Sequence, residues 1–320
     1  MTNTVFLNVA KVNFDHRLDL SKLATITNLT TYDHSTEAQI LERVAKQEII
    51  ITKEIPLSKE LIMQFPESVK LICEAGTGYN NIDIDAAKER NIMVCNLPGY
   101  STESVAQLAI TYILSLSSSL TKQHAMLKNQ NYDNFFKHLQ VPYFELKDKV
   151  LGVIGAGTIG KQLIDFALAL GMDIQVYTRS QKNWDNARIQ SVDLDTLLMN
   201  SDFVSLNCPL TEETRHLINK HRLQLMKPTA YIINTSRGPL INEQDLIAAL
   251  QEKTIAGAAL DVLEQEPPDR NNPLFTMDNV ILTPHIGWQS IEARQRLLKL
   301  LTGNIEAYIA GTPTNVVNQA

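Results

Sequence analysis

A glycine-rich turn in the middle of the chain is the feature that most restricts the fold. Residues 150–154 form an apolar run, residues 155–160 read GAGTIG, and apolar residues at helical spacing follow. Strand, GxGxxG loop and helix in this order are typical of a dinucleotide-binding α/β domain. We expect a pyrophosphate at the helix N-terminus, where free N–H groups and the positive end of the helix dipole face it. The candidate cofactor contacts in this turn are Gly155, Gly157, Thr158, Ile159 and Gly160.

Strand-like and helix-like segments alternate along the rest of the chain. Strands are expected at 5–9, 49–52, 71–73 and 92–95, and after the glycine turn at 174–177, 203–206, 231–234, 255–260 and 280–282. This alternation predicts parallel sheets with crossover helices. With 150–154, the later runs supply six strands, enough for a complete dinucleotide-binding domain. A chain of 320 residues has room for a second domain.

Several longer segments organise these units. Residues 36–46 are expected to form a helix, and residues 102–128 a long helix that is apolar over much of its circumference, which predicts burial at a domain or subunit interface. Residues 129–149 are expected to be an irregular connection. Residues 290–309 form a further predicted helix, and because the cofactor sheet is already complete there, we expect it to return to the first domain.

Composition excludes several classes of function. The net charge is −6 and there is no basic stripe or basic amphipathic segment, so neither nucleic acid nor a membrane surface is an expected partner. The three cysteines, Cys73, Cys95 and Cys208, are widely separated, which predicts neither a disulfide framework nor a metal site. The N-terminus lacks the pattern of a signal peptide, and the expected location is the cytoplasm.

The residues after the second strand of the cofactor domain differ from those that usually bind NAD. Roughly 20 residues past the loop, an Asp or Glu is expected to bind the ribose 2′-hydroxyl of NAD. This chain has Thr178, Arg179 and Ser180 there. Hydroxyls and a guanidinium bind a 2′-phosphate, which a carboxylate would repel, so we expect NADP(H) to be preferred over NAD(H). The alternative is that Arg179 is a solvated surface residue and NAD binds through the ribose alone.

Three motifs farther along the chain end on, or follow, predicted strands and each carry a reactive side chain. Arg237 lies in NTSRG, Glu266 in DVLEQEP and His285 in TPHIGW. Ligands of an open α/β sheet gather outside the carboxyl ends of its strands, so these residues can share one cleft. The fork of the Arg237 guanidinium matches a carboxylate and can also polarise the keto oxygen of a 2-keto acid. For an isolated arginine, a structural ion pair would be the simpler explanation.

His285 and Glu266 complete a set that can move a proton. An imidazole can protonate a keto oxygen as hydride arrives at the neighbouring carbon, and can take the proton back in the reverse direction. A carboxylate bonded to the imidazole would select its tautomer and favour its charged form. Glu264 competes for this role, but Pro267 and Pro268 can hold Glu266 rigidly. The other histidines have no comparable setting: His16, His34, His124, His138, His216 and His221.

These motifs make the chain resemble the D-isomer-specific 2-hydroxyacid dehydrogenases over nearly its whole length. The resemblance rests on residues 155–160, 207–211, 234–240, 261–267 and 283–290. In that family the Arg, Glu and His of these motifs are the catalytic set, which implies Arg237, Glu266 and His285 here. Residues 100–107 and 284–288 are most similar to the glycerate dehydrogenase and hydroxypyruvate reductase branch.

The resemblance also implies an architecture. A Rossmann-type cofactor domain, residues 100–287, would be inserted into a flavodoxin-like substrate domain made of residues 1–99 and 288–320. A homodimer would form through the long helix at 102–128. No metal is implied.

Further contacts are implied by the resemblance alone. Backbone N–H groups around Thr77 and Gly78 would hold the substrate carboxylate, and Asp261 would bind the nicotinamide amide. Tyr100 and Trp288 are candidates to line the substrate pocket, with ordinary packing as the alternative. The remaining implied cofactor contacts are Cys208, Pro209, Thr211, Thr235, Ser236 and Gly287.

We therefore expect NAD(P)-dependent reduction of a small 2-keto acid, hydroxypyruvate or glyoxylate first, to the D-2-hydroxy acid. One alternative is a D-2-hydroxyacid dehydrogenase that acts on D-lactate or on branched-chain analogues. Another is a non-catalytic NAD(P)-sensing protein like the family's transcriptional corepressors, although no long disordered extension is evident.

Overall fold

The structure, a computed structural model, describes residues 1–179 and 183–318 of the chain. It divides into two compact units, one of Met1–Ser101 with Trp288–Ala320 and one of Thr102–Gly287. Each unit holds one parallel sheet, which confirms the predicted α/β class with two parallel sheets. Ser180, a predicted cofactor contact, lies outside the described residues.

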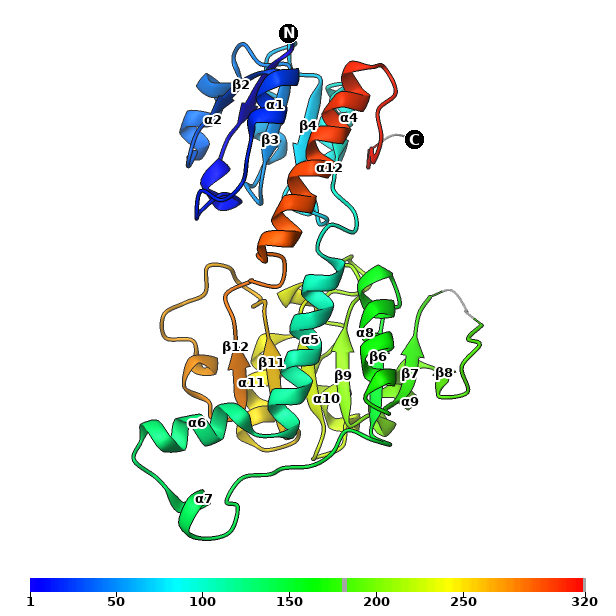
Figure 1. Ribbon diagram of the computed structural model, residues 1–320. Coiled ribbons are helices and arrows are strands. Elements are labelled where there is room, and N and C mark those ends of the chain that lie inside the picture. The colour runs from blue at the N-terminus through cyan, green and yellow to red at the C-terminus, as the bar shows by residue number, and fades with distance from the viewer. Residues whose placement is uncertain (180–182, 319–320) are drawn as a thin grey trace. The chain divides into compact units, whose positions relative to one another are not determined.

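Within the described residues, the sheet of the first unit has five parallel strands in the order β2-β1-β3-β4-β5. Figure 1 labels three of them, β2, β3 and β4. The strands are β1 (Asn3–Phe6), β2 (Asn28–Thr31), β3 (Ile49–Thr52), β4 (Leu71–Glu74) and β5 (Met93–Cys95). Every residue of the two central strands β3 and β4 is buried. Strands covered on both faces are near-continuous apolar runs, so both strands could be predicted from the sequence.

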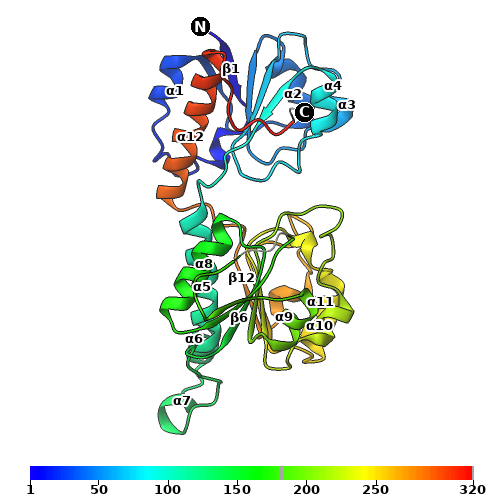
Figure 2. The same ribbon diagram turned by 90° about the vertical axis from the view of Figure 1, so that its right-hand side faces the viewer.

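Helices cover both faces of this sheet (Figure 2). They are α1 (Ser21–Ile26), α2 (Glu37–Val44), α3 (Lys59–Ile62), α4 (Ile84–Glu89) and α12 (Ile291–Ile309), with a 3-10 turn, η1, at Val9–Lys11. Leu23 of α1 and Leu297 of α12 share one core with Phe6, while Ile40 of α2 shares the other with Val5. Successive residues of a strand point to opposite faces, so β1 contributes to both cores. The C-terminal helix is therefore part of the first unit.

Within the described residues, the sheet of the second unit has seven parallel strands in the order β12-β11-β10-β9-β6-β7-β8. The strands are β6 (Val150–Ile154), β7 (Asp173–Tyr177), β8 (Ile189–Ser191), β9 (Phe203–Leu206), β10 (Tyr231–Asn234), β11 (Gly257–Leu260) and β12 (Val280–Leu282). The strand order reverses beside β6, which pairs with both β7 and β9. The glycine turn leaves the carboxyl end of β6, so it lies at the topological switch point where such sheets bind ligands.

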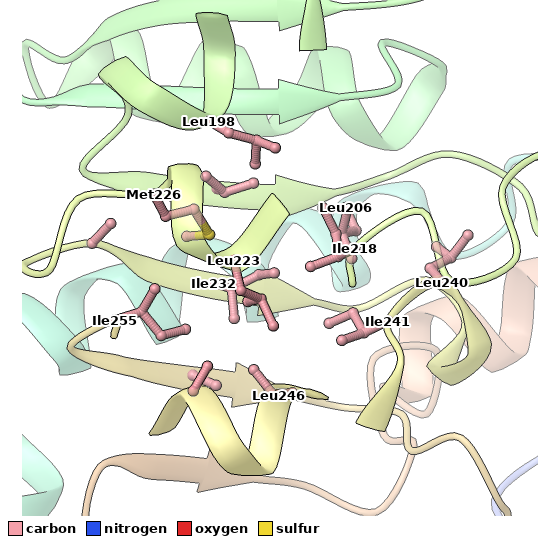
Figure 3. Close-up of a cluster of buried hydrophobic side chains, with 14 of the residues drawn as sticks. Leu198, Leu206, Ile218, Leu223, Met226, Ile232, Leu240, Ile241, Leu246 and Ile255 are labelled. Carbon is pink, nitrogen blue, oxygen red and sulfur yellow. The ribbon is translucent and has the colours of Figure 1, made fainter. Parts of the chain in front are cut away.

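Two helical layers enclose this second sheet (Figure 2). The helices of the second unit are α5 (Thr102–Ser117), α6 (Leu120–Lys128), α7 (Asp133–Phe136), α8 (Thr158–Ala169), α9 (Leu194–Asn200), α10 (Lys220–Leu225) and α11 (Glu243–Gln251), with 3-10 turns η2 (Gly238–Leu240) and η3 (Pro273–Thr276). Of these, α6 and α7 have no buried residues and are not part of the two layers. Leu198, Leu223 and Leu246 of α9, α10 and α11 pack on one face around Ile232 of β10 (Figure 3). Side chains of α5 and α8 pack on the other face.

The single helix predicted over residues 102–128 is wrong. The segment forms two helices, α5 and α6, bent by 63°. Ser119 between them has a φ of 49°, a left-handed conformation that ends α5. The hydroxyls of Ser117 and Ser118 both donate to the carbonyl of Leu114. Serine side chains compete for helical carbonyls in this way, so a run of serines can interrupt a helix without a proline.

The sequence also missed the outer strands β2 and β8. Each pairs with only one other strand, and most of their residues are exposed. An edge strand with little burial needs no apolar run, so periodicity did not reveal it. The seven-stranded sheet therefore corrects the prediction of six. In the predicted irregular connection at 129–149, the structure places the short helix α7.

Among the described residues, no single helix has the length and apolar character needed to cross a membrane. The bent pair of α5 and α6 meets that test only when both helices are counted together, by length and composition alone.

Candidate active site

Three neighbouring strands of the second unit present the predicted catalytic residues. Arg237 follows β10, Glu266 lies on the segment after β11, and His285 follows β12. The strands β10, β11 and β12 are adjacent and parallel. Their carboxyl ends therefore share one edge of the sheet, where ligands of such folds bind.

His285 and Glu266 form a hydrogen-bonded pair. Nδ1 of His285 lies 2.8 Å from Oε2 of Glu266. The other carboxylate oxygen, Oε1, accepts the backbone N–H of Leu263 at 3.1 Å, so the carboxylate is held at both oxygens. Because an ionised carboxylate only accepts, Nδ1 is the donor, and Nε2 is the nitrogen that can exchange a proton with a ligand.

A buried aspartate fixes the loop that carries His285. Asp261, 2% exposed, accepts the backbone N–H groups of Ile286 and Gly287, each at 2.8 Å, and the hydroxyl of Thr283. The backbone N–H of His285 donates to the Asp261 carbonyl at 2.8 Å. His285 itself has a φ of 54°, an unusual conformation for a residue other than glycine, and these bonds on both sides hold it.

Burial raises the pKa of Asp261, and the hydrogen bonds from Thr283, Gly287 and Ile286 oppose that rise. The aspartate thus has a structural task in holding the His285 loop. Contacts of Asp261 and Gly287 with a nicotinamide cofactor stay predictions.

The turn that carries Arg237 is braced by Asn234 at the end of β10. The Asn234 amide donates to the Arg237 carbonyl at 2.8 Å, and its oxygen accepts the N–H of Ser236 at 3.0 Å. The guanidinium donates to the Ser236 carbonyl at 2.8 Å. Among the described residues, no carboxylate forms an ion pair with Arg237, so the simpler ion-pair explanation is not what the structure shows.

The glycine turn has the geometry of a cofactor cradle. A β-carbon on Gly160 would lie 2.2 Å from the carbonyl oxygen of Gly155, and one on Gly155 would lie 2.7 Å from the backbone nitrogen of Cys208. Protein packing alone therefore requires both glycines. A β-carbon on Gly157 would meet no atom within 4 Å, and no side chain caps α8 at that residue. Open space at the N-terminus of α8 fits a pyrophosphate.

The other predicted cofactor contacts lie at the ends of β9 and β10. The hydroxyl of Thr235 is buried without a hydrogen-bond partner among the described residues, as a group awaiting a ligand would be. Ser236 donates to the carbonyl of Cys208 at 2.7 Å. Thr214 braces the next turn, donating to the Pro209 carbonyl at 2.8 Å and accepting from the N–H of Thr211 at 2.7 Å.

Thr178 and Arg179 directly follow β7, where a ribose would be distinguished from its 2′-phosphate. The Arg179 side chain is 78% exposed and lies 3.7 Å from the carboxylate of Glu213. An exposed ion pair of this kind is weak, so the guanidinium can turn to an anionic ligand.

The remaining predicted residues lie in the first unit. Thr77 and Gly78 follow β4, and the hydroxyl of Thr77 donates to the carbonyl of Leu97 at 2.8 Å. Tyr100 and Trp288 are 3% and 4% exposed and belong to the core that packs against α1 and α12. Their contact with a substrate stays a prediction.

Sequence reasoning missed a second histidine–glutamate pair. Nε2 of His216 lies 2.6 Å from Oε1 of Glu264, the residue considered as a competitor of Glu266. Glu264 and Glu243 each accept the other's backbone N–H at 3.0 Å, and the N–H of His216 donates to the Pro239 carbonyl at 2.8 Å. The network ties the turn after Arg237 to the segment that leads to Glu266. No local motif around His216 indicates a partner so distant in the chain.

Across the described part of the chain, no group of three or more His, Cys, Asp or Glu side chains is arranged to hold a metal ion.

Comparison with known proteins follows the same motifs. Residues 110–287 match the family described as D-isomer specific 2-hydroxyacid dehydrogenase, NAD binding domain. The hydroxypyruvate reductase of Blautia hydrogenotrophica is 36% identical over 312 residues, which are 94% of this chain and 95% of that protein.

Solved structures resemble the whole chain. The D-lactate dehydrogenase of Aquifex aeolicus, in complex with NAD and lactic acid, has a TM-score of 0.87 and 29% identity, covering 99% of this chain and 100% of that one. The NADPH-dependent glyoxylate/hydroxypyruvate reductase of Sinorhizobium meliloti, in complex with NADP and malonate, has a TM-score of 0.85 and 25% identity, covering 99% and 96%.

Proposed function

Because the chain belongs to the D-isomer-specific 2-hydroxyacid dehydrogenase family, we propose that it reduces hydroxypyruvate to D-glycerate or glyoxylate to glycolate. Its class is that of an NAD(P)-dependent D-2-hydroxyacid dehydrogenase, and its relatives include glycerate dehydrogenases and hydroxypyruvate reductases. The observation that carries the proposal is the 2.8 Å pair of His285 and Glu266 at the edge where strands of a cofactor-binding sheet end.

Each catalytic side chain has a defined task in this proposal. The glycine turn at the N-terminus of α8 would hold a nicotinamide cofactor, which would supply the hydride for the carbonyl carbon. His285, protonated and oriented through Nδ1 by Glu266, donates the Nε2 proton to the carbonyl oxygen. Glu266 stabilises the charged imidazole before transfer and keeps its tautomer afterwards. Arg237 polarises the carbonyl and opposes the negative charge that develops on its oxygen. The N–H groups around Thr77 and Gly78 bind the substrate carboxylate.

A keto-acid panel tests this function. Hydroxypyruvate, glyoxylate, pyruvate and 2-ketoisocaproate are each supplied with NADH and with NADPH, and turnover is followed by nicotinamide absorbance. We expect the highest kcat/KM with hydroxypyruvate or glyoxylate and a D-configured product from hydroxypyruvate. Preference for pyruvate or 2-ketoisocaproate would move the enzyme to the group that acts on lactate or branched-chain substrates. Cofactor binding without any turnover would contradict the assignment of His285.

We also propose that NADP(H) is preferred over NAD(H). Solved relatives contain NAD in one case and NADP in another, so the preference depends on the residues that follow β7. Thr178 and Arg179 provide a hydroxyl and a cation there, and no carboxylate takes the place of Thr178. Opposing this, Glu213 lies near the guanidinium and would be repelled by a phosphate.

Variants at these positions test the preference. Arg179→Ala should weaken NADPH binding about tenfold and leave NADH unchanged, since a charge-assisted bond to phosphate is lost. Arg188→Ala is a matched control, because Arg188 is ion-paired with Asp148 and Asp173 near the other end of β7. Equal affinities of the wild type for both cofactors would show that Arg179 is a surface residue.

We further propose a homodimer formed through the α5–α7 region. Large apolar side chains are exposed there, including Leu114 on α5, Leu120 on α6, and Phe135 and Phe136 on α7. Exposed apolar residues gathered in one region mark an interaction surface. Light scattering should give twice the chain mass for the wild type and a lower mass for the Phe135→Ser/Phe136→Ser double variant. A monomeric wild type would contradict this proposal.

A further inference from the structure

A lysine is buried in the first unit beside the loop that follows β4. Lys53 directly follows β3 and is 4% exposed. Its ammonium is hydrogen-bonded to the Glu54 carboxylate and lies 4.4 Å from the centroid of the Trp288 ring. Its backbone is held by the Asn8 side chain, with hydrogen bonds of 2.7 and 3.0 Å. Lysine is almost never buried this fully without a specific arrangement.

The ammonium of Lys53 packs directly against the loop of residues 76–78, which we call the 76–78 loop. A β-carbon on Gly76 would lie 3.0 Å from Nζ of Lys53. Glycine at this position therefore allows the positive charge to approach the loop backbone closely. The loop lies between β4 and α4, and Lys53 lies in the segment after β3. Because β3 and β4 are paired neighbours, the two segments leave the sheet side by side.

The carbonyl groups of the 76–78 loop accept the hydrogen bonds that hold its backbone. The Gly76 carbonyl accepts from the N–H of Leu97 at 2.9 Å, and the Thr77 carbonyl accepts from the side chain of Asn96 at 2.7 Å. Among the described residues, the backbone N–H groups of Gly76, Thr77 and Gly78 donate no hydrogen bond. Successive free N–H groups form a concave site that binds anions.

The charge of Lys53 is not fully balanced by the carboxyl groups beside it, because one is shared with a second lysine and the other is partly protonated near neutral pH. Burial acts to lower the pKa of Lys53, but Tyr100, Glu54 and Glu74 raise it overall, so the lysine remains charged. Glu54 is also ion-paired with Lys11 at 3.5 Å. Burial raises the pKa of Glu74 to about 7, against the opposing effect of Lys53, so this carboxyl is partly neutral. Glu54 thus lies beside two ammonium groups, and Glu74 carries less than a full negative charge near neutral pH.

We propose that Lys53 is a positioning residue for substrate binding, whose buried ammonium supplies the positive potential that lets the 76–78 loop bind the carboxylate of a 2-keto acid. This rests on the proposed function, which assigns the substrate carboxylate to that loop. Peptide N–H groups carry only partial charges, and a full cation beside the loop, shielded from water, adds a strong attraction for an anion. Lys53 acts through the loop and does not itself form the contact.

Lys53→Met tests the proposal because it keeps the length and apolar stem of the side chain and removes its charge. We expect KM for the best keto acid to rise about tenfold or more, with kcat and NADPH affinity changed less than about twofold. For the uncharged methyl ester of the same keto acid, Lys53→Met should change KM little. Lys59→Met is the matched control, since Lys59 is an exposed partner of Glu89 in the same unit; its KM should equal that of the wild type.

Glu54→Gln provides an independent test in the opposite direction. It removes the negative charge beside Lys53 and keeps a hydrogen-bond acceptor, so KM for the keto acid should fall. Circular dichroism and melting curves establish that each variant is folded. If Lys53→Met does not fold, Glu54→Gln and Lys53→Arg decide: an unchanged KM in Glu54→Gln contradicts the proposal, and a KM near that of wild type in Lys53→Arg supports it.

The outcomes separate this inference from the proposed function. Equal losses for the keto acid and its ester in Lys53→Met would show that the lysine only supports the structure. Absence of keto-acid turnover in the wild type would refute the proposed function. Calorimetric titration with oxamate, a carboxylate that needs no turnover, would then decide whether Lys53→Met weakens anion binding; unchanged binding would overturn the inference.

Discussion

Replacing two glycines of the glycine turn by alanine should have different effects. Gly160→Ala should lower stability, whereas Gly157→Ala should lower cofactor affinity. Gly160→Ala would place a methyl group 2.2 Å from the Gly155 carbonyl oxygen, where only backbone movement can relieve the clash. Overpacking of this kind costs about 1–3 kcal/mol or more in the free energy of unfolding. Gly157→Ala adds a methyl group that meets no protein atom within 4 Å. Its cost in stability should be below about 1 kcal/mol, the scale of an N-cap change.

Cofactor affinity should respond differently from stability, because it should fall in Gly157→Ala, the variant that is expected to remain stable. The open space at Gly157 is where a pyrophosphate would approach the N-terminus of α8, so the methyl group of Gly157→Ala should weaken NADPH and NADH binding about tenfold or more. Fluorescence titration measures the affinity for each cofactor, and urea unfolding measures stability. Gly303→Ala is the control: its β-carbon also meets nothing within 4 Å, but it lies in α12, away from the turn. It should bind cofactor normally and gain up to about 1 kcal/mol of stability, since alanine favours a helix.

A stable Gly157→Ala variant that binds both cofactors as tightly as the wild type would refute the assignment of the turn. A Gly160→Ala variant with unchanged stability would refute the packing argument.

Four further substitutions test the active site and the buried carboxyl group. His285→Ala should lower kcat by about 10²–10⁴-fold in stopped assays, because the proton donor is lost; a rate near that of wild type would mean that another group supplies the proton. Arg237→Ala should lower kcat and raise KM together, and an effect on KM alone would assign the guanidinium to binding only. Glu266→Gln should lower kcat at least about tenfold with little effect on cofactor affinity, because an amide does not stabilise the charged imidazole; unchanged kcat would contradict the pairing. The pKa of Glu74 is raised from 4.5 to about 7, so the folded state holds a proton that the unfolded state has released, and the free energy of unfolding should fall by about 3 kcal/mol as pH rises through that interval. Urea unfolding at a series of pH values should show this slope in the wild type and not in Glu74→Gln.

Features that depend on nearby residues could be predicted from the sequence. Continuous apolar runs identified the central strands, because strands buried on both faces must be apolar throughout. The GAGTIG turn and the Arg237, Glu266 and His285 motifs follow strand ends, and the carboxyl ends of parallel strands collect at one edge. The α/β class and the position of the three side chains on the cofactor-binding unit followed from that order.

Features that depend on residues far apart in sequence required the coordinates. Local spacing hardly distinguishes Glu264 from Glu266. In the structure Glu264 pairs with His216, and Glu266 pairs with His285. The apolar residues on both sides of the serine run predict one continuous helix, but the left-handed conformation of Ser119 interrupts it. No local pattern marks Lys53 as buried, and one of the groups beside its ammonium is the ring of Trp288, more than two hundred residues later in the chain. Periodicity reports which face of an element is buried, whereas pairing and burial of single polar groups depend on which elements meet, and that information is not local.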